Sequence, residues 1–385
     1  MTTPSPEQAA AALLSLPGMS PLRLRTLLDC FGGPVRALDA VAAGRALEAL
    51  PSTTVTAARR HRELAAVWTG RDNHDALWRL LERRGTHVWI DGVMPYPIRD
   101  DLPHRPPVLL AEGARPDVLT APRVAVIGTR AATPHGLADA RELGGFLAAA
   151  GLTVVSGMAI GIDGAAHEGA IAALAGDKSV FEPTEGTTGG PVGVVATGLD
   201  IEYPRRHTNL YAAVRRHGVV VGETAFGVRP ARQRFPIRNR IIAALADVVV
   251  VVEATLRGGA RITAQFALDY GRTVLAVPGS RRNPAAAGTN ALIADGAHPL
   301  VEWEDVLLAL GLSEAGRATR ASQAPSAPAI STDGVAVLRA LGGEAATPDD
   351  LSTRSGLSLE RTAAAIAELE RTLSVERSRG VIWAR

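Results

Sequence analysis

The strongest constraint on the fold is a run of five valines, Val248–Val252. Successive side chains of a strand point to opposite faces, so an all-valine strand is expected where a sheet is covered on both sides. Similar apolar runs recur through the middle of the chain, and each precedes a helical pattern. The predicted strands are Val124–Ile127, Thr153–Val155, Gly193–Ala196, Val219–Val221, Val248–Val252 and Thr273–Val277. This alternation predicts a doubly wound α/β domain with a mostly parallel sheet.

The region before the sheet is predicted to be helical. Residues 1–75 carry short helix patterns, and the α/β domain is expected over residues 76–312, beginning with a proline-rich segment of short strands at 86–110. A turn at Pro17-Gly18 resembles a helix-hairpin-helix, which would bring helix amides to a DNA phosphate. Packing into a core is the favoured alternative for the leucines around this turn. They are Leu13, Leu16, Leu24, Leu27 and Leu28.

Two further segments follow the α/β domain. Residues 313–331 are rich in Ala, Pro and Ser and predict a flexible linker. Residues 332–385 have three helix patterns and a hairpin around Arg379-Gly380, which is the arrangement of a winged helix, with Ser358–Leu369 in the position of the recognition helix. This last segment holds seven basic and eight acidic residues, so a contact with protein is at least as strongly predicted as one with DNA.

The composition excludes several classes of protein. The formal net charge is only +2, so anion binding must come from local clusters of charge. Lys178 is the only lysine, and arginine therefore carries nearly all the positive charge. Cys30 is the only cysteine, which excludes an intrachain disulfide and favours a reducing cytosol. No signal-peptide pattern and no apolar run near the roughly 20 residues of a membrane span are present, so we expect a cytoplasmic protein.

One stretch has the composition of a nucleic-acid site. Gly227–Ala246 has no acidic residue, carries Phe235 near its centre, and joins an apparent loop to a helix. Its arginines are Arg229, Arg232, Arg234, Arg238 and Arg240. Because guanidinium groups hold phosphates and a ring stacks on a base, the stretch predicts contact with a single strand. The alternative is a solvated basic turn with Phe235 in the core.

Loops at the carboxyl ends of the predicted strands would complete this site, because parallel strands end at one edge of a sheet. Gly128-Thr129-Arg130 offers a close backbone approach, a hydroxyl and a guanidinium. A glycine-rich loop, Ser156–Gly164, leads into a helix that carries Asp163 and His167. An Asp/His pair could bind a metal, but no third ligand follows, so a structural helix cap at Asp163 is the favoured interpretation.

Catalytic patterns are absent from the sequence. Gly176-Asp177-Lys178-Ser179 has the wrong spacing for a phosphate-binding P-loop, and neither HExxH nor GxSxG occurs. Glu223 and Glu253 follow strands and could act as acid and base, but we expect them to orient arginines or amides instead. The sequence therefore predicts a binding protein rather than an enzyme, with no cofactor.

Eight blocks of this domain closely resemble the DprA/Smf family of DNA-processing proteins. In order they are VAVIGTR, SGMAIGIDGAAH, TGLDIEYPRRH, GETAFG, FPIRNRIIAAL, VVVEATLRGGARITAQFAL, GRTVLAVPGS and GTNALIADGA, within residues 124–297. The resemblance implies an extended Rossmann-like fold that forms homodimers. It also implies a cytosolic, non-enzymatic binder of single-stranded DNA. Such a protein protects incoming strands in natural transformation and loads the RecA recombinase, with single-strand-binding protein as a further partner.

The resemblance also implies roles for individual residues. Arg130 matches the family's phosphate-binding arginine, and Phe235 matches the position whose ring lines a base pocket. Arg232 stands where lysine is usual, while Arg238 and Asn239 match a helix start. A polar rim would come from Ser156, Gly157, Gly279 and Asn290. The full set of expected DNA-binding residues is Gly128, Thr129, Arg130, Ser156, Gly157, Arg232, Phe235, Arg238, Asn239, Arg257, Gly279 and Asn290.

Three departures from the family pattern affect these expectations. Lys178–Gly190 has the character of an inserted surface loop rich in Gly, Thr and Glu. A serine-rich loop of the family is replaced by Gly258–Thr263, which loses hydroxyl donors and gains Arg261. Arginine in place of lysine at Arg232 keeps the charge and changes the geometry of phosphate contact.

Two alternatives come from other functional classes. The segment Arg257–Thr263 resembles faintly the PGGxGTxxE loop of nucleotide-cleaving LOG-type phosphoribohydrolases, but Gln265-Phe266 stand where a glutamate is needed. A winged-helix transcription factor with a sensory sheet is the other alternative, and the acidic balance of residues 332–385 weakens it.

Overall fold

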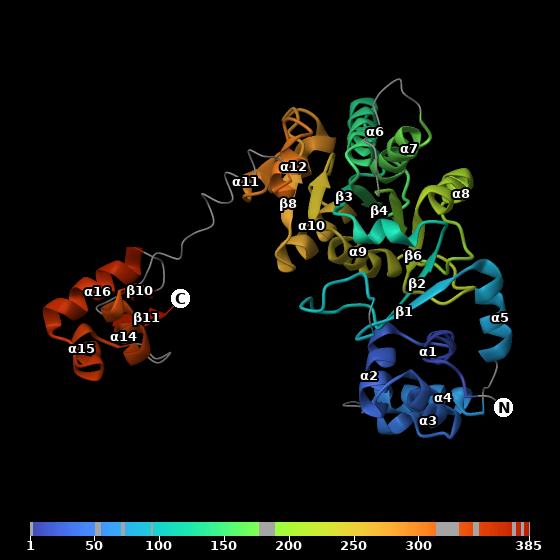
Figure 1. Cartoon of the computed structure of the whole chain (residues 1–385), viewed down its shortest axis with the longest axis horizontal. Helices are drawn as coiled ribbons and strands as arrows, with labels where there is room; N and C mark the ends of the chain where they lie inside the picture. Colours follow the sequence, from blue (N-terminus) through green and yellow to red (C-terminus); the bar gives the residue numbers. More distant parts are fainter. Residues whose placement is uncertain are drawn as a thin grey trace. The chain divides into compact units, whose positions relative to one another are not determined.

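The computed structural model describes residues 3–50, 55–70, 74–93, 95–176, 189–312, 331–341, 346–371, 375–378 and 381–384. The chain divides into two compact units, Met1–Leu310 and Gly311–Arg385 (Figure 1). The predicted insertion at residues 178–190 lies outside the described residues except for Gly189 and Gly190, and the predicted linker at 313–331 lies outside them except for Ser331. Within the described part of the chain, no helix is long and apolar enough to cross a membrane.

The first unit is built on one large sheet. Its described strands run in the order β1-β2-β6-β5-β4-β3-β7-β8-β9. They are β1 (His87–Ile90), β2 (Val108–Glu112), β3 (Arg123–Ile127), β4 (Thr153–Ser156), β5 (Pro191–Val194), β6 (Val219–Gly222), β7 (Val248–Val251), β8 (Thr273–Ala276) and β9 (His298–Pro299). Strand β2 runs antiparallel to both β1 and β6, and the other pairs are parallel. The mostly parallel α/β sheet is confirmed, and all six predicted strands are present.

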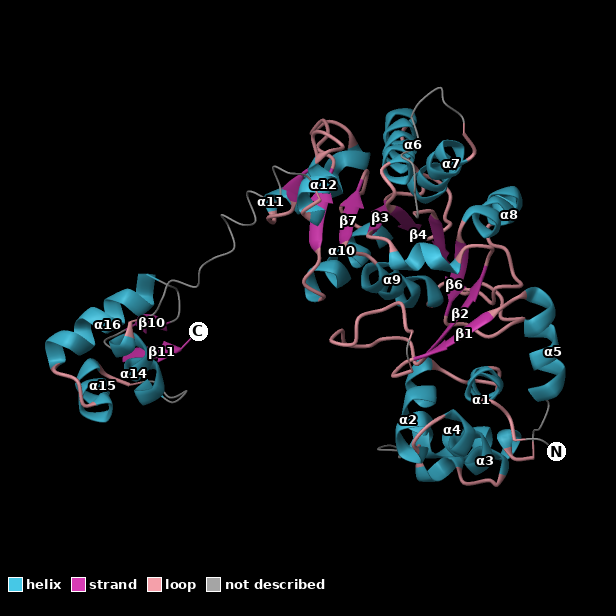
Figure 2. Cartoon of the chain, viewed as in Figure 1, coloured by secondary structure: helices cyan, strands magenta, loops and turns pink. Residues whose placement is uncertain are grey.

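Helices cover both faces of this sheet (Figure 2). They are α6 (Pro134–Ala149), α7 (Ile162–Leu174), α8 (Thr208–His217), α9 (Arg234–Leu245), α10 (Gly259–Asp269), α11 (Ala287–Ala294) and α12 (Asp305–Leu310). The valines of β7 divide between two cores. Val249 and Val251 pack with α9 and α10, whereas Val248 and Val250 pack with α6 and α7. Burial on both faces explains why this strand is all valine.

The N-terminal helices pack against the antiparallel edge of the sheet. They are α1 (Pro6–Leu14), α2 (Pro21–Phe31), α3 (Pro34–Ala42), α4 (Val55–Trp68) and α5 (His74–Arg84). Leu13, Leu24 and Leu27 are fully buried in one core with Ile90 and Val108 of the sheet. The favoured packing role of the leucines beside Pro17-Gly18 is confirmed. Contact of this turn with DNA stays a prediction, as does the proposed domain boundary at residue 75.

The second unit is a small winged helix. Its elements are α14 (Thr332–Leu341), α15 (Pro348–Ser355), α16 (Leu359–Arg371), β10 (Val375–Ser378) and β11 (Val381–Ala384). Strands β10 and β11 form the predicted antiparallel hairpin, although its turn at 379–380 lies outside the described residues. Helix α16 occupies the predicted recognition-helix segment, and its Arg361 forms an ion pair with Asp333 at 2.6 Å.

Candidate nucleic-acid interface

A cavity of about 290 Å³ opens at the carboxyl end of the sheet. It lies where the chain order reverses, because β3 has β4 on one side and β7 on the other. Open parallel sheets bind ligands at such a switch point. The residues that follow β3 and β7 line the cavity together with the first turns of α9 and α10. Asp163 of α7 also lines the cavity. The lining residues include Gly128, Thr129, Arg130, Asp163, Phe235, Arg238, Asn239, Ala254, Thr255, Gly258, Gly259 and Thr263.

Two helix N-termini face this cavity without a side-chain cap. Helix α9 starts after Gln233 and α10 after Gly258, and neither residue provides a side-chain cap. In α9 the amide of Arg234 donates to the Ala231 oxygen at 3.0 Å and Pro236 has no N–H, so α10 offers more free amides than α9. Helix α6, away from the cavity, has a cap, since the Thr133 hydroxyl accepts from the amide of Gly136 at 3.1 Å. Uncapped first-turn amides and the positive end of the helix dipole favour an anion. The cavity is therefore electrostatically suited to a phosphate.

Arg130 and Phe235 form one wall of the cavity. The exposed Arg130 places its guanidinium carbon 5.0 Å from the centroid of the Phe235 ring, within the range of a cation–π contact. Phe235 is half-buried in the first turn of α9, and its other neighbour is the ring of Tyr203, with 5.7 Å between centroids. A smaller hollow of about 60 Å³ lies on this second side and is lined by Arg130, Tyr203 and Phe235.

Arg238 lines the cavity but is only 5% exposed. Its Nη1 donates to the backbone oxygens of Gly157, at 2.6 Å, and Val194, and its Nε donates to the Asn239 side chain at 3.2 Å. The Asn239 amide in turn donates to the Gly259 oxygen at 3.1 Å. These bonds tie α9 to the loop after β4, to the last residue of β5 and to the start of α10. Much of the donor capacity of Arg238 is thus engaged by protein carbonyls.

The structure gives Asp163 a role that differs from the expected helix cap. Helix α7 has Gly161 at its N-cap, with a φ of +88° and no side-chain cap. Asp163 instead accepts hydrogen bonds from the amides of Gly157, at 3.2 Å, and Ala159, at 3.4 Å. It therefore braces the loop that precedes the helix. Burial raises the pKa of the Asp163 carboxyl, and the nearby Arg238 charge opposes that rise.

His167 is fully buried in α7. Burial lowers the pKa of His167 to about 4, so the ring is neutral near pH 7. Among the described residues, no group of three or more His, Cys, Asp or Glu side chains could hold a metal ion. His167 thus belongs to the core of the helix–sheet packing.

Glu223 and Glu253 are both engaged by protein groups, as expected. Glu223 forms a buried ion pair with Arg240 of α9. Glu253 accepts from the amide of Thr133, at 2.8 Å, and from its hydroxyl, at 2.7 Å. The two carboxylates therefore anchor α9 and the start of α6.

Several predicted site residues lie away from the cavity lining. Ser156 was expected at a polar rim, but it is the last residue of β4, is fully buried, and donates its hydroxyl to the Val126 oxygen at 2.6 Å. Asn290 exchanges two hydrogen bonds with the backbone of Gly279, at 2.9 and 3.1 Å, and so closes its own loop. Arg232 and Arg257 are exposed and flank the cavity in sequence, one before α9 and the other before α10.

Two predicted glycines are required by close packing. A Cβ on Gly128 would lie 2.4 Å from the Ile162 side chain and 2.8 Å from the Glu253 oxygen. A Cβ on Gly157 would lie 2.7 Å from the Asp163 carboxylate and 2.8 Å from the Arg238 guanidinium. Contacts this short force the neighbours to move, so Gly128 lets the loop after β3 approach α7 and the segment after β7, and Gly157 lets the loop after β4 approach Asp163 and Arg238.

One aromatic residue beside the cavity was missed as a site residue. Tyr203 belongs to the loop after β5, and its ring contacts Phe235 although the two lie on different segments. The available signal was the segment Tyr203–His207, in which an aromatic residue precedes Arg205 and Arg206. Exposure of the ring depends on tertiary packing, so the sequence alone does not identify it.

Comparison with known proteins agrees with this architecture. Residues 88–311 match the family described as DNA recombination-mediator protein A, and residues 321–370 match the DprA winged helix domain. A Mycobacterium tuberculosis protein named as a DNA processing protein DprA is 38% identical over 370 residues, which cover 90% of this chain and 86% of that protein. Protein Smf of Escherichia coli is 33% identical over 295 residues, or 73% of this chain and 75% of that protein.

A solved structure has the same fold. The X-ray structure of DNA processing protein A from Streptococcus pneumoniae superimposes with a TM-score of 0.60 at 28% identity, covering 80% of this chain and 98% of that one. The sheet, the N-terminal helices and the winged helix are thus explained by one set of relatives, and the chain belongs to the DprA/Smf family.

Proposed function

We propose that this protein binds single-stranded DNA, with one unpaired base in the 290 Å³ cavity and the adjoining phosphates at its mouth. The observation that carries the proposal is the contact of Arg130 with Phe235 in the first turn of α9, at a cavity that the uncapped start of α10 also lines. A ring, a guanidinium and free amides supply stacking and phosphate contacts together. A base in a duplex must be unpaired and unstacked before it can enter such a cavity, at a cost of a few kcal/mol, so the site favours single strands.

The exposed arginines and the buried arginine have different roles in this proposal. Arg130 and Arg232 are exposed and free to meet phosphates, with Arg257 beside the start of α10. Arg238 donates to two backbone carbonyls, so it holds the loops that shape the cavity and contacts the strand only secondarily. Ser156, Gly279 and Asn290 support loops and are left out of the proposed direct contacts.

The biological role that fits this binding is recombination mediation in the cytoplasm. The family description names a recombination mediator, and we propose that the bound strand is handed to the RecA recombinase. Single-strand-binding protein is then the competitor that must be displaced. We propose a homodimer formed through α10, whose exposed arc carries Ile262 and Leu268 with Leu256 just before it. Exposed apolar groups of this kind are typical of protein interfaces.

We propose binding without catalysis. Of the described residues that line the cavity, Asp163 is the one acid, and its carboxylate already accepts from two loop amides. General acid–base chemistry needs a group within reach of the substrate, and Asp163 is buried behind the loop. Release of free base from nucleoside monophosphates would contradict this proposal and favour the LOG-type alternative.

The test is a pair of titrations across salt with a labelled strand, single or annealed to its complement. If about 3–5 phosphates are neutralised, log affinity for the single strand should fall with log salt at a slope of roughly −2 to −4. Tighter binding of the duplex at all salt concentrations would contradict the proposal. The RecA step is tested separately, by the rate at which RecA assembles on strands coated with single-strand-binding protein. If this protein does not accelerate that assembly, the proposed mediator role fails, but the proposed binding of single-stranded DNA stands.

A further inference from the structure

We propose that Tyr203 is a second stacking surface, so that the site holds two successive bases, one in the 290 Å³ cavity and the next over the 60 Å³ hollow beside Tyr203. This inference rests on the proposed single-strand binding and names a residue that extends it. Tyr203 is 40% exposed, and its ring makes a tilted contact with Phe235, with an interplanar angle of 41°. A large exposed aromatic ring beside a cationic cavity is suited to base stacking.

Phe235 separates two compartments. It lines the larger cavity with Thr129 and Asn239, and it lines the smaller hollow with Tyr203 and Pro204. Arg130 and Arg238 border both compartments. A strand that inserts one base into the larger cavity would therefore bring its neighbouring base over the hollow, where the Tyr203 ring is the available aromatic surface.

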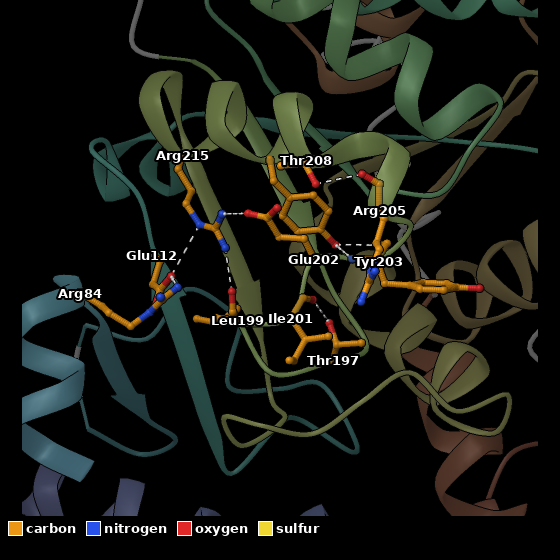
Figure 3. Close-up of polar contacts among 11 residues, drawn as sticks. Arg84, Glu112, Thr197, Leu199, Ile201, Glu202, Tyr203, Arg205, Thr208 and Arg215 are labelled. Atoms are coloured by element: carbon orange, nitrogen blue, oxygen red, sulfur yellow. Dashed lines mark hydrogen bonds and ion pairs between the residues drawn. The ribbon is translucent and has the colours of Figure 1, made fainter. Parts of the chain in front are cut away.

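The backbone of Tyr203 is fixed independently of its ring. The hydroxyl of Tyr211, which is buried in α8, donates to the Tyr203 oxygen at 3.0 Å and accepts from the Tyr203 amide at 3.4 Å. Figure 3 shows the Tyr203 ring pointing away from this clamp and from the other polar contacts of the loop. The ring is thus not needed for the loop conformation, which leaves it free for a ligand.

A partly buried polar network holds the rest of the loop. Arg215 of α8 donates to the Leu199 oxygen at 2.7 Å and to the Glu202 carboxylate at 2.8 Å (Figure 3). It also approaches Glu112, a nearly buried carboxylate of β2 that accepts two hydrogen bonds of 2.7 Å from Arg84.

Hydroxyl groups fix the two ends of the loop. Thr197 donates to the Ile201 oxygen at 2.8 Å, and Thr208 donates to the Arg205 oxygen at 2.9 Å. A contact surface that is ordered before binding loses little conformational entropy when the ligand arrives. The loop therefore presents Tyr203 as a preorganised platform.

The experiment is a double-mutant cycle on binding of a labelled oligothymidylate, with wild type, Tyr203→Ala, Phe235→Ala and the double variant. Loss of one stacked base should weaken binding by about 5- to 150-fold, the equivalent of roughly 1–3 kcal/mol. Two stacking surfaces predict that the double variant is weaker than either single variant. Because the two rings are in contact, their free energies are expected to be coupled rather than strictly additive. Tyr203→Phe should bind as wild type does, and Tyr203→Leu should be weakened as Tyr203→Ala is.

Two results would overturn the second stacking surface, and a different one would overturn the proposed function. If Tyr203→Ala binds as tightly as wild type while Phe235→Ala is weakened, the second stacking surface is overturned and the proposed function stands. If the double variant is no weaker than Phe235→Ala, Tyr203 only supports the Phe235 ring, which also overturns the inference. If wild-type protein fails to bind the strand, the proposed function itself fails. Thermal unfolding of every variant checks that the clamp by Tyr211 keeps the loop folded.

Discussion

The guanidinium carbon of Arg130 lies 5.0 Å from the centroid of the Phe235 ring, so a cation covers one face of an aromatic side chain at the mouth of the cavity. The two residues come from the loop after β3 and from the first turn of α9, which are more than a hundred positions apart in the sequence. Their contact joins the two chemical functions that a nucleotide requires, a charge for the phosphate and a ring for the base.

Replacement of Phe235 by alanine should weaken binding of single-stranded DNA by about 5- to 150-fold, because the stacking surface and the support of Arg130 are both lost. Fluorescence anisotropy with a labelled oligonucleotide measures the change. Phe31→Ala is the matched control, because Phe31 carries a similar contact with Arg45, at 5.6 Å, among the N-terminal helices. Equal affinities for the Phe235→Ala and Phe31→Ala proteins would exclude Phe235 from the site.

Buried Arg238 and exposed Arg232 should differ in their effect on stability. Arg238→Ala leaves the buried oxygens of Gly157 and Val194 without this donor, which should lower the free energy of unfolding by at least about 2 kcal/mol. Arg232→Ala should change it by less than about 0.5 kcal/mol while it still weakens DNA binding. Urea denaturation provides both values. An Arg238→Ala protein as stable as wild type would show that the hydrogen bonds of Arg238 to these two oxygens do not contribute to the free energy of unfolding.

His167 should make the first unit less stable in mild acid. Its pKa is about 4 in the folded chain and close to 6.5 when exposed. Between these values the unfolded chain binds a proton that the folded chain does not, so stability falls as pH decreases from 6.5 to 4, by about 3 kcal/mol in total. His167→Leu should flatten this dependence. Urea midpoints measured at several pH values test the slope, and identical slopes for both proteins would contradict the buried neutral state.

A charge on the exposed arc of α10 should break the proposed homodimer. Ile262 and Leu268 are 41% and 51% exposed in the single chain, so Ile262→Glu and Leu268→Glu should be tolerated by the fold. Both proteins should sediment as monomers, because burying an unpaired carboxylate at an interface is costly. Leu308→Glu on α12 is the control, since Leu308 is also exposed. Dimers that persist in both α10 variants would place the interface elsewhere.

Much of the fold could be predicted because burial on two faces leaves a local signal. The valines of β7 and the apolar runs around it alternate with helices, so the sheet follows from pattern and topology. Strand β5 begins two residues earlier than predicted, at Pro191, and Val195 continues the ladder by donating to the Val221 oxygen at 2.9 Å. Segment ends depend on such individual hydrogen bonds, which composition does not specify.

The site was less predictable because side-chain direction and exposure are tertiary properties. The sequence places Arg130 and Phe235 in loops, and only the fold brings the two side chains into contact. Ser156 has a hydroxyl that could serve as a donor in a loop. It stands at the end of β4, however, where the hydroxyl points into the core and donates to the Val126 oxygen. Asp163 follows a glycine that already occupies the N-cap, so its carboxylate is free to bind the preceding loop.

The phosphate contact of Arg130 is tested by the salt dependence of single-strand binding by Arg130→Ala, with Arg216→Ala as the control. Arg216 is an exposed arginine near the C-terminal end of α8, and it lines neither compartment. Loss of one phosphate contact should weaken binding several-fold and reduce the slope of log affinity against log salt by about 0.7. The Arg216→Ala protein should retain the wild-type slope. A wild-type slope and affinity in the Arg130→Ala protein would show that Arg130 does not hold a phosphate of the strand.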